Sequence, residues 1–398
     1  MKVLLVHNFY ISTSPSGEDS VFAEEKELLL RHGIKIKTYE RHNDDIVRLS
    51  KSERLGIPSQ LIWSQKTYGE LKRLIEVEDP DIAHFHNIFY LISPSAYYAC
   101  KKLGVPVVQT LHNFRMYCVN GLLTRDGRVC EACVKKLPWR GVAYGCYSQS
   151  RLHSFSVALM QTFHRLAGTW RNKVDAYIAL TEFGRKKHIE FGLPEDKVFV
   201  KPNFLQNPPE PKYSNNGYAI FLGRFSLEKG VNTLIDACGI LQSNFHNHFI
   251  VKALGDGPLK KSLQVKCKDN KILNIEFTGR RSFSECMELL KGAQFMVMPS
   301  ISYENFPMTI REAFACGKPV IASRLGAMAE LVEDGKTGIL FKPGSPNDLA
   351  AKIKWMLDNK DACVEMGKNA RAEFEAKYTA DKNYEILMGI YHSVLSKH

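Results

Sequence analysis

Short apolar runs that alternate with helix-forming segments constrain the fold of this 398-residue sequence more than any other feature. At the N-terminus, KVLLV (2–6) precedes a loop with one glycine, a helical segment from about 20 to 31, and the strand-like IKIKTYE (34–40). Strand, loop, helix and strand in that order are typical of parallel α/β domains, whose ligands bind beyond the carboxyl ends of the strands. Further apolar runs continue the pattern at 81–87, 105–113, 174–180, 197–203, 218–222, 248–258, 274–280, 294–300, 318–323 and 338–341.

A segment rich in proline, asparagine and serine, FLQNPPEPKYSNNG (204–217), divides this series and has the composition of a linker. The length suits two domains of roughly 200 residues, each with its own core. We therefore predict a first domain at 1–203 and a second at 204–377. The alternation breaks between 114 and 155, where a loop contains four of the ten cysteines.

The stretch PSISYENFPMTIREAFACG (299–317) combines the end of a strand, a loop and the start of a helix. We expect the helix to begin near Pro307, because proline suits the first helical turn. The amide groups and the dipole at such a helix start favour phosphate. Glu304 lies in the loop and Glu312 lies inside the helix, so the stretch suits a ligand with both phosphate and hydroxyl groups. Taken alone, it would equally fit two solvated glutamates.

A second strand end, in YAIFLGRFSLEKG (218–230), places two cations beside a tight glycine turn. Gly223 and Arg224 end the strand, and Lys229 precedes the next helical segment. Arginine can chelate phosphate oxygens and lysine adds a point charge, so the spacing suits a diphosphate. If the glutamates further along the sequence were absent, we would interpret these two residues as a surface arginine and lysine that bind no ligand.

The E-x7-E pattern from Glu304 to Glu312 resembles the signature of the family 4 retaining glycosyltransferases, and G-R-x-x-x-x-K-G is similar to the phosphate clamp of that family. Other motifs of the family occur in the expected order along nearly the whole chain. The resemblance implies the GT-B arrangement, in which two Rossmann-like, doubly wound α/β domains face each other across an interdomain cleft. It also implies that 378–398 forms a helix that crosses back to the N-terminal, acceptor-side domain.

The resemblance further implies roles for individual residues. Arg224 and Lys229 would neutralise the leaving diphosphate, Glu312 would bind the ribose, Glu304 would bind the transferred sugar, and His112 would contact that sugar. The set of catalytic residues is His112, Glu304, Arg224 and Lys229. The set of donor-binding residues is Gly17, Gly223, Arg224, Lys229, Gly279, Arg280, Glu304, Asn305, Phe306, Pro307, Met308, Thr309 and Glu312.

The sequence departs from the family pattern in two places. Asn305 and Pro307 replace glycines that are common around Phe306, which affects the sugar pocket. Gly17 stands alone where many family members have two adjacent glycines, so it is the residue that would let the backbone approach the donor phosphate.

The expected activity is retaining transfer of a sugar from a nucleoside-diphosphate sugar, of UDP or GDP type, to a glycan or lipid-linked acceptor in cell-surface polysaccharide biosynthesis. We expect no cofactor to be required for catalysis. A nucleotide-sugar epimerase of similar two-domain fold is the alternative. A nucleic-acid-binding protein would account for the basic residues and cysteines, but not for the clamp, the glutamates and the β/α order, so we expect no nucleic acid partner.

The net charge of +12 is concentrated between 101 and 174, where twelve Lys and Arg stand against two acids, a difference of +10. Such a block suggests an anionic partner, either lipid headgroups, a lipid-linked diphosphate or nucleic acid, although a solvated basic face has the same composition.

No apolar run reaches the ~18 residues that a spanning helix needs. MKVLLVHNFY has the pattern of a first strand rather than a secretory signal. We expect a cytoplasmic protein that docks on the inner, anionic face of the membrane.

Four clustered cysteines suggest a structural zinc site. Cys130 and Cys133 have the C-x2-C spacing at which one turn offers two thiolates to a single ion, and Cys118 and Cys146 flank them. A metal is favoured over a disulfide in the reducing cytosol. Four reduced thiols that pack a loop are the alternative, because the sequence lacks a second C-x2-C pair.

Overall fold

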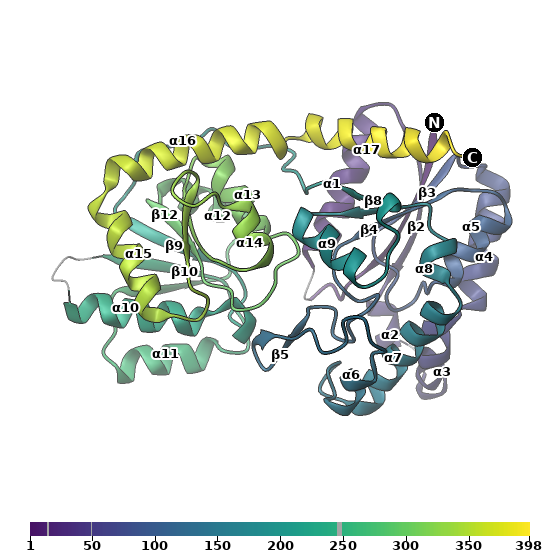
Figure 1. The fold of residues 1–398 in the computed structure, drawn as a ribbon, viewed down its shortest axis with the longest axis horizontal. Coiled ribbons are helices and arrows are strands. Elements are labelled where there is room, and N and C mark those ends of the chain that lie inside the picture. Colours follow the sequence, from purple (N-terminus) through teal and green to yellow (C-terminus); the bar gives the residue numbers. More distant parts are fainter. Residues whose placement is uncertain (14–15, 49, 245–248) are drawn as a thin grey trace. The chain divides into compact units, whose positions relative to one another are not determined.

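The computed structural model describes residues 1–13, 16–48, 50–244 and 249–398 (Figure 1). The chain forms two compact units. The first comprises Met1–Leu123, Glu131–Asn203 and Asn383–His398, and the second comprises Thr124–Cys130 and Phe204–Lys382. The short segment Thr124–Cys130 thus belongs to the second unit, whereas we predicted from the sequence that the whole loop 114–155 lies in the first domain.

The first unit contains a parallel sheet of six strands. Its strands are β1 (Lys2–Phe9), β2 (Lys35–His42), β3 (Ile82–Phe85), β4 (Val107–Leu111), β7 (Ala176–Ala179) and β8 (Val198–Val200). They lie in the order β2-β1-β3-β4-β7-β8, and every pair is parallel. The central strands are buried along their whole length, as expected where helices cover both faces of a sheet.

Helices surround this sheet. They are α1 (Gly17–Arg31), α2 (Asp44–Arg48), α3 (Lys51–Ile62), α4 (Gln65–Glu78), α5 (Ser95–Lys102), α6 (Trp139–Ala143), α7 (Arg151–Leu166), α8 (Thr169–Asn172), α9 (Glu182–Glu190) and the one-turn η1 (Glu195–Lys197). The last helix, α17 (Ala380–Leu395), also packs here from Asn383 onward. Its Leu387, Ile390 and Tyr391 are buried in one core with Val3 and Val108.

The second unit contains another parallel sheet of six strands. The strands are β9 (Tyr218–Leu222), β10 (Ile250–Leu254), β11 (Ile275–Gly279), β12 (Phe295–Met298), β13 (Val320–Ser323) and β14 (Gly338–Phe341), in the order β11-β10-β9-β12-β13-β14. The connecting helices are η2 (Leu227–Lys229), α10 (Val231–Asn244), α11 (Lys260–Asp269), α12 (Phe283–Gly292), α13 (Met308–Ala315), α14 (Gly326–Leu331), α15 (Pro346–Asp358) and α16 (Lys360–Lys377). A small antiparallel hairpin of β5 (Thr124–Arg125) and β6 (Arg128–Val129) belongs to this unit.

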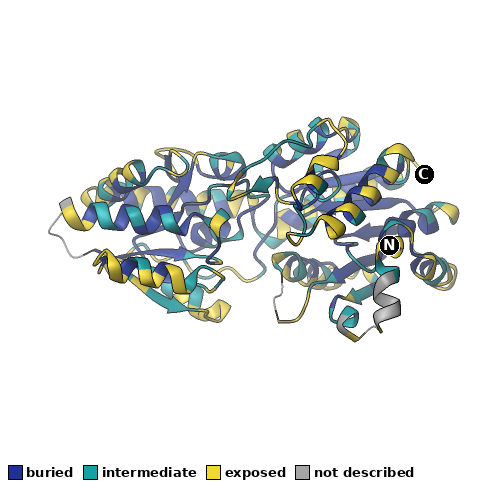
Figure 2. Ribbon diagram, turned by 90° about the horizontal axis from the view of Figure 1, so that it is seen from below, coloured by how far each residue is buried: buried dark blue, intermediate teal, exposed yellow. Residues whose placement is uncertain are grey.

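Both units are doubly wound α/β sheets, so the predicted fold class is confirmed. Most strand residues are buried, and most exposed residues lie on helices and loops, as Figure 2 shows. The strand order reverses between β1 and β3 in the first sheet, and between β9 and β12 in the second. In such sheets, ligands bind beyond the carboxyl ends of the two strands where the order reverses. Among the described residues, no helix is both long and apolar enough to cross a membrane.

Candidate functional site

The clamp and the E-x7-E stretch meet at the reversal point of the second sheet. The loop after β9 contains Arg224 and Lys229, and the loop after β12 contains Glu304. Because β9 and β12 are adjacent and parallel, these two loops emerge side by side at the same edge of the sheet (Figure 1). The tertiary structure therefore brings the two sequence motifs together.

Glycine holds the two loops in close contact. Gly230 has a φ of +65°, and a Cβ atom at this position would lie 1.8 Å from the carbonyl oxygen of Pro299. The amide of Ile301 also donates a hydrogen bond of 2.9 Å to the carbonyl of Glu228. Only glycine permits this approach, because any side chain would collide with the backbone of the neighbouring loop.

Lys229 and Glu304 form an ion pair across these loops. The Nζ atom of Lys229 lies 2.7 Å from Oε1 and 2.9 Å from Oε2 of Glu304. The hydroxyl of Ser300 donates to Oε1 over 2.8 Å. Arg224, at the end of β9, is exposed and available to an anion. The site thus presents one cation to solvent and a second that a carboxylate holds in place.

The start of α13 lies in the same loop cluster. The helix begins at Met308, and Pro307 is its N-cap, without a side-chain hydrogen bond to the first turn. Thr309 is in that first turn, and Asn305 precedes the cap. Phe306 is buried and packs edge-on against Tyr378, with ring centroids 5.9 Å apart.

Glu312 lies one turn further into α13. Burial raises the pKa of Glu312, and the guanidinium of Arg311, 3.5 Å away, opposes that shift. Arg311 is itself buried, and its Nη1 donates to the carbonyl of Phe204. The Glu312 carboxylate is therefore held on a rigid helix by a fixed neighbour.

A third loop, after β10, completes the cluster and was missed in the sequence analysis. A Cβ atom at Gly255 would lie 1.9 Å from the carbonyl oxygen of Gly223, and one at Gly257 would lie 2.5 Å from that of Phe225. The amide of Gly255 donates to the carbonyl of Gly279 at the end of β11. The Gly-Asp-Gly sequence directly after an apolar run was the signal that could have identified this loop.

Gly279 and Arg280 lie at the end of β11, beyond this third loop. Gly279 has a φ of +74°, which favours glycine, and Arg280 is exposed. These residues are two strands away from β9 in the sheet. The donor-binding residues predicted in the second domain thus all occupy the carboxyl edge of one sheet or the helix that follows it.

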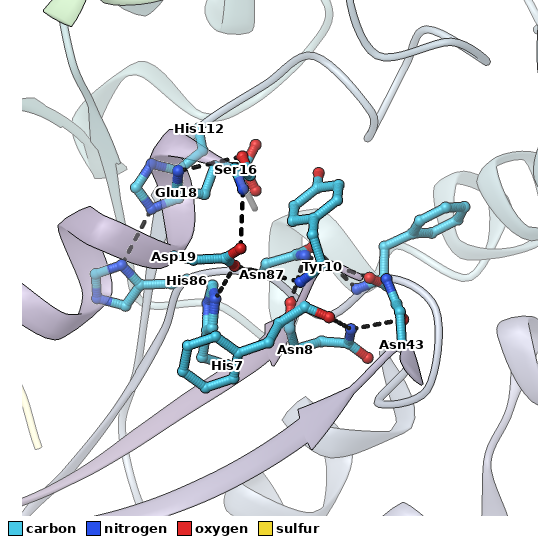
Figure 3. A network of polar contacts seen from close by, with 12 residues as sticks. His7, Asn8, Tyr10, Ser16, Glu18, Asp19, Asn43, His86, Asn87 and His112 are labelled. Atoms are coloured by element: carbon cyan, nitrogen blue, oxygen red, sulfur yellow. Dashed lines mark hydrogen bonds and ion pairs between the residues drawn. The ribbon is translucent and has the colours of Figure 1, made fainter. Parts of the chain in front are cut away.

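Gly17 is the first residue of α1, at the reversal point of the first sheet. Ser16 caps this helix and forms a capping box with Asp19, which also contacts Nε2 of His7 over 2.9 Å (Figure 3). A Cβ atom at Gly17 would meet nothing within 4 Å. Packing within the protein therefore does not demand a glycine here, which leaves ligand approach as a reason for it.

His112 follows β4 and ends a chain of buried polar contacts. Nε2 of His86 lies 3.1 Å from Oε1 of Glu25, and Nδ1 of His86 lies 3.0 Å from Nε2 of His112. Figure 3 shows the two imidazole rings side by side. Burial lowers the pKa of His86 to about 4, and burial together with His86 holds the pKa of His112 well below its usual value. Both rings are therefore neutral at pH 7.

The contacts of Glu25 determine which nitrogen of His112 holds the proton. Burial would raise the pKa of Glu25, but Lys201 and the two neighbouring histidines, His84 and His86, keep it well below the usual value. The ionised carboxylate accepts from Nε2–H of His86, so Nδ1 of His86 accepts from Nε2–H of His112. Nδ1 of His112 is left as a hydrogen-bond acceptor. A pocket of about 60 Å³ lies beside this ring, and its wall includes Met160.

The described residues contain one group of side chains that could hold a metal ion, and the four cysteines of the proposed zinc site are not part of it. Ligand-type atoms of three residues lie within 4.8 Å of one another only at Glu25, His84 and His86, as far as the described residues extend. The ammonium of Lys201 already neutralises that cluster. Burial raises the pKa of Cys118, whose thiol lies 3.0 Å from Oδ1 of Asn120. The zinc site at Cys118, Cys130, Cys133 and Cys146 stays a prediction.

Two family models together match most of the chain. The model for "Glycosyltransferase Family 4" matches residues 21–206, and the model for "Glycosyl transferases group 1" matches residues 204–373. The uncharacterized glycosyltransferase MJ1178 of Methanocaldococcus jannaschii is 28% identical over 351 residues, which covers 86% of this chain and 90% of that protein.

Solved structures share the fold over the full length. Anabaena Alr3699/HepE, crystallised with UDP, has a TM-score of 0.68 at 18% identity and covers 99% of this chain and 100% of its own. The lipopolysaccharide outer core galactosyltransferase WaaB has a TM-score of 0.67 at 15% identity, with 99% of both chains covered. Together with the clamp and the E-x7-E stretch at one sheet edge, these matches show that the chain is a glycosyltransferase enzyme of the GT-B fold that belongs to the group 1, family 4 glycosyltransferases.

Proposed function

We propose that this enzyme transfers a sugar from a UDP- or GDP-sugar to a glycan or lipid-linked acceptor, with retention of anomeric configuration, in cell-surface polysaccharide biosynthesis. The observation that carries the proposal is the ion pair of Lys229 and Glu304 beside Arg224 at the reversal point of the second sheet. The UDP bound to the Anabaena protein and the lipopolysaccharide role of WaaB support the donor and the acceptor class.

The chemistry follows from where charge develops. When the bond between the sugar and the diphosphate breaks, negative charge accumulates on the leaving diphosphate. Arg224, Lys229 and the amide groups at the start of α13 are cationic or polarised donors that stabilise this charge. These groups supply the electrostatic role that a metal plays in other transferases, so we propose that no metal is required for catalysis.

Glu304 and Glu312 are proposed to orient the donor. Glu312, held by Arg311 on α13, accepts hydrogen bonds from the ribose. Glu304 accepts from hydroxyls of the transferred sugar while Lys229 and Ser300 hold its carboxylate in place. Because these contacts fix Glu304 as a positioning group, we propose a same-face substitution, in which the acceptor adds on the face from which the diphosphate leaves.

His112 is proposed to contact the transferred sugar. Its Nδ1 atom is an acceptor, so it takes a hydrogen bond from a sugar hydroxyl rather than donating one. A neutral ring also avoids placing a second positive charge beside the sugar carbon, which becomes positively charged as the diphosphate leaves. The lipid-linked form of the acceptor would place the enzyme at the cytoplasmic face of a membrane.

Binding and product analysis test the proposal. Calorimetry with a panel of UDP-, GDP- and ADP-sugars should give saturable binding of one nucleotide class, and Arg224→Ala should weaken it. Incubation with that donor and a glycan or lipid-linked acceptor should give an elongated product whose anomeric proton coupling matches the donor. Conversion of the donor to another nucleotide sugar without an acceptor would instead identify an epimerase. The matched glycosyltransferases favour transfer.

A further inference from the structure

Helix α7 exposes an apolar face. Five large apolar side chains, spaced three or four residues apart and therefore aligned on one side of the helix, are exposed by 37% to 76% of their surface. They are Leu152, Phe155, Leu159, Phe163 and Leu166. A surface helix of a globular protein normally turns such residues toward the core, and a contiguous exposed apolar patch marks an interaction site.

Polar contacts on the opposite side hold α7 in this orientation. The buried face of the helix includes Ser154, Gln161, Thr162 and His164. Ser154 accepts a hydrogen bond from the amide of Tyr147, and Gln161 donates one to the carbonyl of Arg115. The ring of His164 contacts the carbonyl of Ile62 over 2.8 Å. Rotation of the helix to bury its apolar side chains would leave these polar groups without partners, which is costly in a protein interior.

The segment before α7 extends the apolar face. Trp139 of α6 is 38% exposed, and its ring lies 6.0 Å from that of Phe155. Nη1 of Arg165 donates to the carbonyl of Lys136 and so fixes this segment beside the helix. We define the α7 face as Trp139 together with the five exposed side chains of α7. Figure 1 shows α6 and α7 as neighbours in the first unit.

Cations accompany the α7 face. Lys136, Arg140, Arg151 and Arg171 are exposed, and within the described ranges none of them has a carboxylate within the 4.0 Å of an ion pair. They belong to the segment 101–174, whose charge difference is +10. An apolar helix face with nearby unpaired cations, and with a tryptophan among its apolar residues, has the composition of helices that lie in the interface of an anionic bilayer.

We propose that α7 lies flat in the interfacial region of an anionic lipid bilayer, with the α7 face against the acyl chains and the cations at the headgroups. The helix has 16 residues, so it is about 24 Å long and too short to span, because a spanning helix needs about 20 apolar residues. The charge favours a bilayer over a protein partner. The inference rests on the proposed function only for the reason to dock, which is access to a lipid-linked acceptor.

The helix also connects the bilayer to the pocket beside His112. Met160 lies on the buried face of α7 and forms part of the pocket wall. The same helix therefore contacts lipid on one side and the pocket on the other. A lipid-linked acceptor would remain anchored in the bilayer while its sugar enters from the helix side.

Vesicle sedimentation of the full chain, without donor or acceptor, tests the proposal. The wild type should sediment with vesicles of equal parts phosphatidylglycerol and phosphatidylcholine, and should bind poorly to phosphatidylcholine alone. Phe155→Ser/Phe163→Ser should lower the partition coefficient by at least about tenfold, since each fully buried aromatic side chain is worth more than a factor of ten in transfer from water. Leu30→Ser/Val77→Ser removes two exposed apolar side chains from α1 and α4 and should bind as the wild type does.

The dependence of vesicle binding on salt distinguishes the contribution of the cations from that of the inserted apolar side chains. Arg140→Gln/Arg151→Gln should weaken binding by about fivefold per cation at low salt, and should flatten its dependence on salt. The phenylalanine variant should keep the salt dependence of the wild type. Brominated lipid should quench the fluorescence of the wild type, and Trp139→Phe should remove most of that quenching. Thermal unfolding shows whether each variant is folded.

Three results would overturn the proposal. The first is that the wild type does not sediment with vesicles at low salt. The second is that the Leu30→Ser/Val77→Ser control loses as much vesicle binding as the Phe155→Ser/Phe163→Ser variant does. The third is a concentration-dependent dimer that Phe155→Ser/Phe163→Ser abolishes. The last would mean that a second copy covers the α7 face. Donor binding in calorimetry should be unchanged in the membrane variants. Intact donor binding without sedimentation would therefore reject this inference alone, and sedimentation without donor binding would reject the proposed function alone.

Discussion

The ammonium nitrogen of Lys201 lies 2.7 Å from Oε2 of Glu25, and both side chains are buried in the first unit. Lys201 also donates to Oδ1 of Asn383, the first residue of α17 that belongs to this unit. The pair therefore ties the C-terminal helix to the sheet and holds the carboxylate that orients His86. Through His86 it decides which nitrogen of His112 accepts a hydrogen bond.

Removing one partner of the ion pair between Lys201 and Glu25 should destabilise the protein strongly, whereas replacing both partners together should destabilise it less than the two single changes combined. Glu25→Gln leaves a buried ammonium and Lys201→Met leaves a buried carboxylate, so each should lower the free energy of unfolding by about 3–5 kcal/mol. The double variant removes both charges and should lose clearly less than the sum of the two. Chemical denaturation measures all three, and single losses below about 1 kcal/mol would contradict a buried charged pair.

Loss of either clamp cation should slow turnover. Arg224→Ala and Lys229→Ala remove groups that stabilise the leaving diphosphate, so we expect turnover to fall by roughly 10²-fold or more. Steady-state kinetics with the identified donor provide the measurement. Lys261→Ala, an exposed lysine on α11, is the control and should retain full turnover. Near-normal turnover in both clamp variants would remove these residues from the catalytic assignment.

Glu312 should act on binding rather than on the chemical step. Its carboxylate is proposed to accept from the ribose, so Glu312→Ala should weaken binding of the bare nucleoside diphosphate in calorimetry. Loss of a hydrogen bond to a charged group costs about 1.5–3 kcal/mol, which corresponds to an increase in Kd of roughly ten- to a hundredfold. Glu304→Ala should change affinity for the nucleotide sugar more than for the nucleotide alone. Unchanged nucleotide affinity in Glu312→Ala would exclude it from the ribose site.

The cysteine loop should contain zinc if the prediction from its spacing is right. Purified protein should then hold about one equivalent of zinc, which Cys130→Ser/Cys133→Ser should lose together with thermal stability. Cys286→Ser, a cysteine outside the loop, should leave the metal content unchanged. Elemental analysis is the measurement, and protein without zinc whose stability and activity survive the double substitution would show that these are ordinary thiols.

Buried histidine should make the first unit sensitive to acid. Both ring nitrogens of His188 are buried without a hydrogen-bond partner among the described residues, and burial lowers the pKa of His188 to about 3. The unfolded chain takes up this proton near its ordinary pKa of about 6.5, before the folded protein does. His188 therefore contributes stability in full above pH ~6.5, and this is lost at up to about 1.4 kcal/mol per pH unit as pH falls toward 3.

Denaturation at several pH values checks this dependence. Between pH 6 and 4, His188→Leu should reduce the slope of unfolding free energy against pH by up to about 1.4 kcal/mol per pH unit, which is the slope that the uptake of one proton produces. His153→Gln, at an exposed position of α7, should leave the slope unchanged. An identical slope in His188→Leu and the wild type would mean that the buried ring is not neutral.

The sequence by itself determined which segments form strands and helices, and which charged residues and glycines lie at the ends of the strands. Apolar runs with helical segments between them predict parallel sheets, because buried strands and amphipathic helices have different periods. Gly223-Arg224, Lys229-Gly230 and the E-x7-E stretch each follow such a run directly, so a short-range pattern was enough to place them at strand ends. The resemblance to a family then supplied their roles.

The tertiary structure alone decided which residues meet. Lys229 and Glu304 are 75 positions apart, and Glu25 and Lys201 are 176 apart. These contacts depend on the order of strands in each sheet and on glycines such as Gly230 and Gly255 that admit close backbones.

The pattern of α7 indicates an amphipathic helix, but local periodicity is the same whichever side faces the core. Hydrogen bonds of Ser154, Gln161 and His164 to residues elsewhere in the fold turn its apolar side outward. Only the folded chain brings those partners within reach.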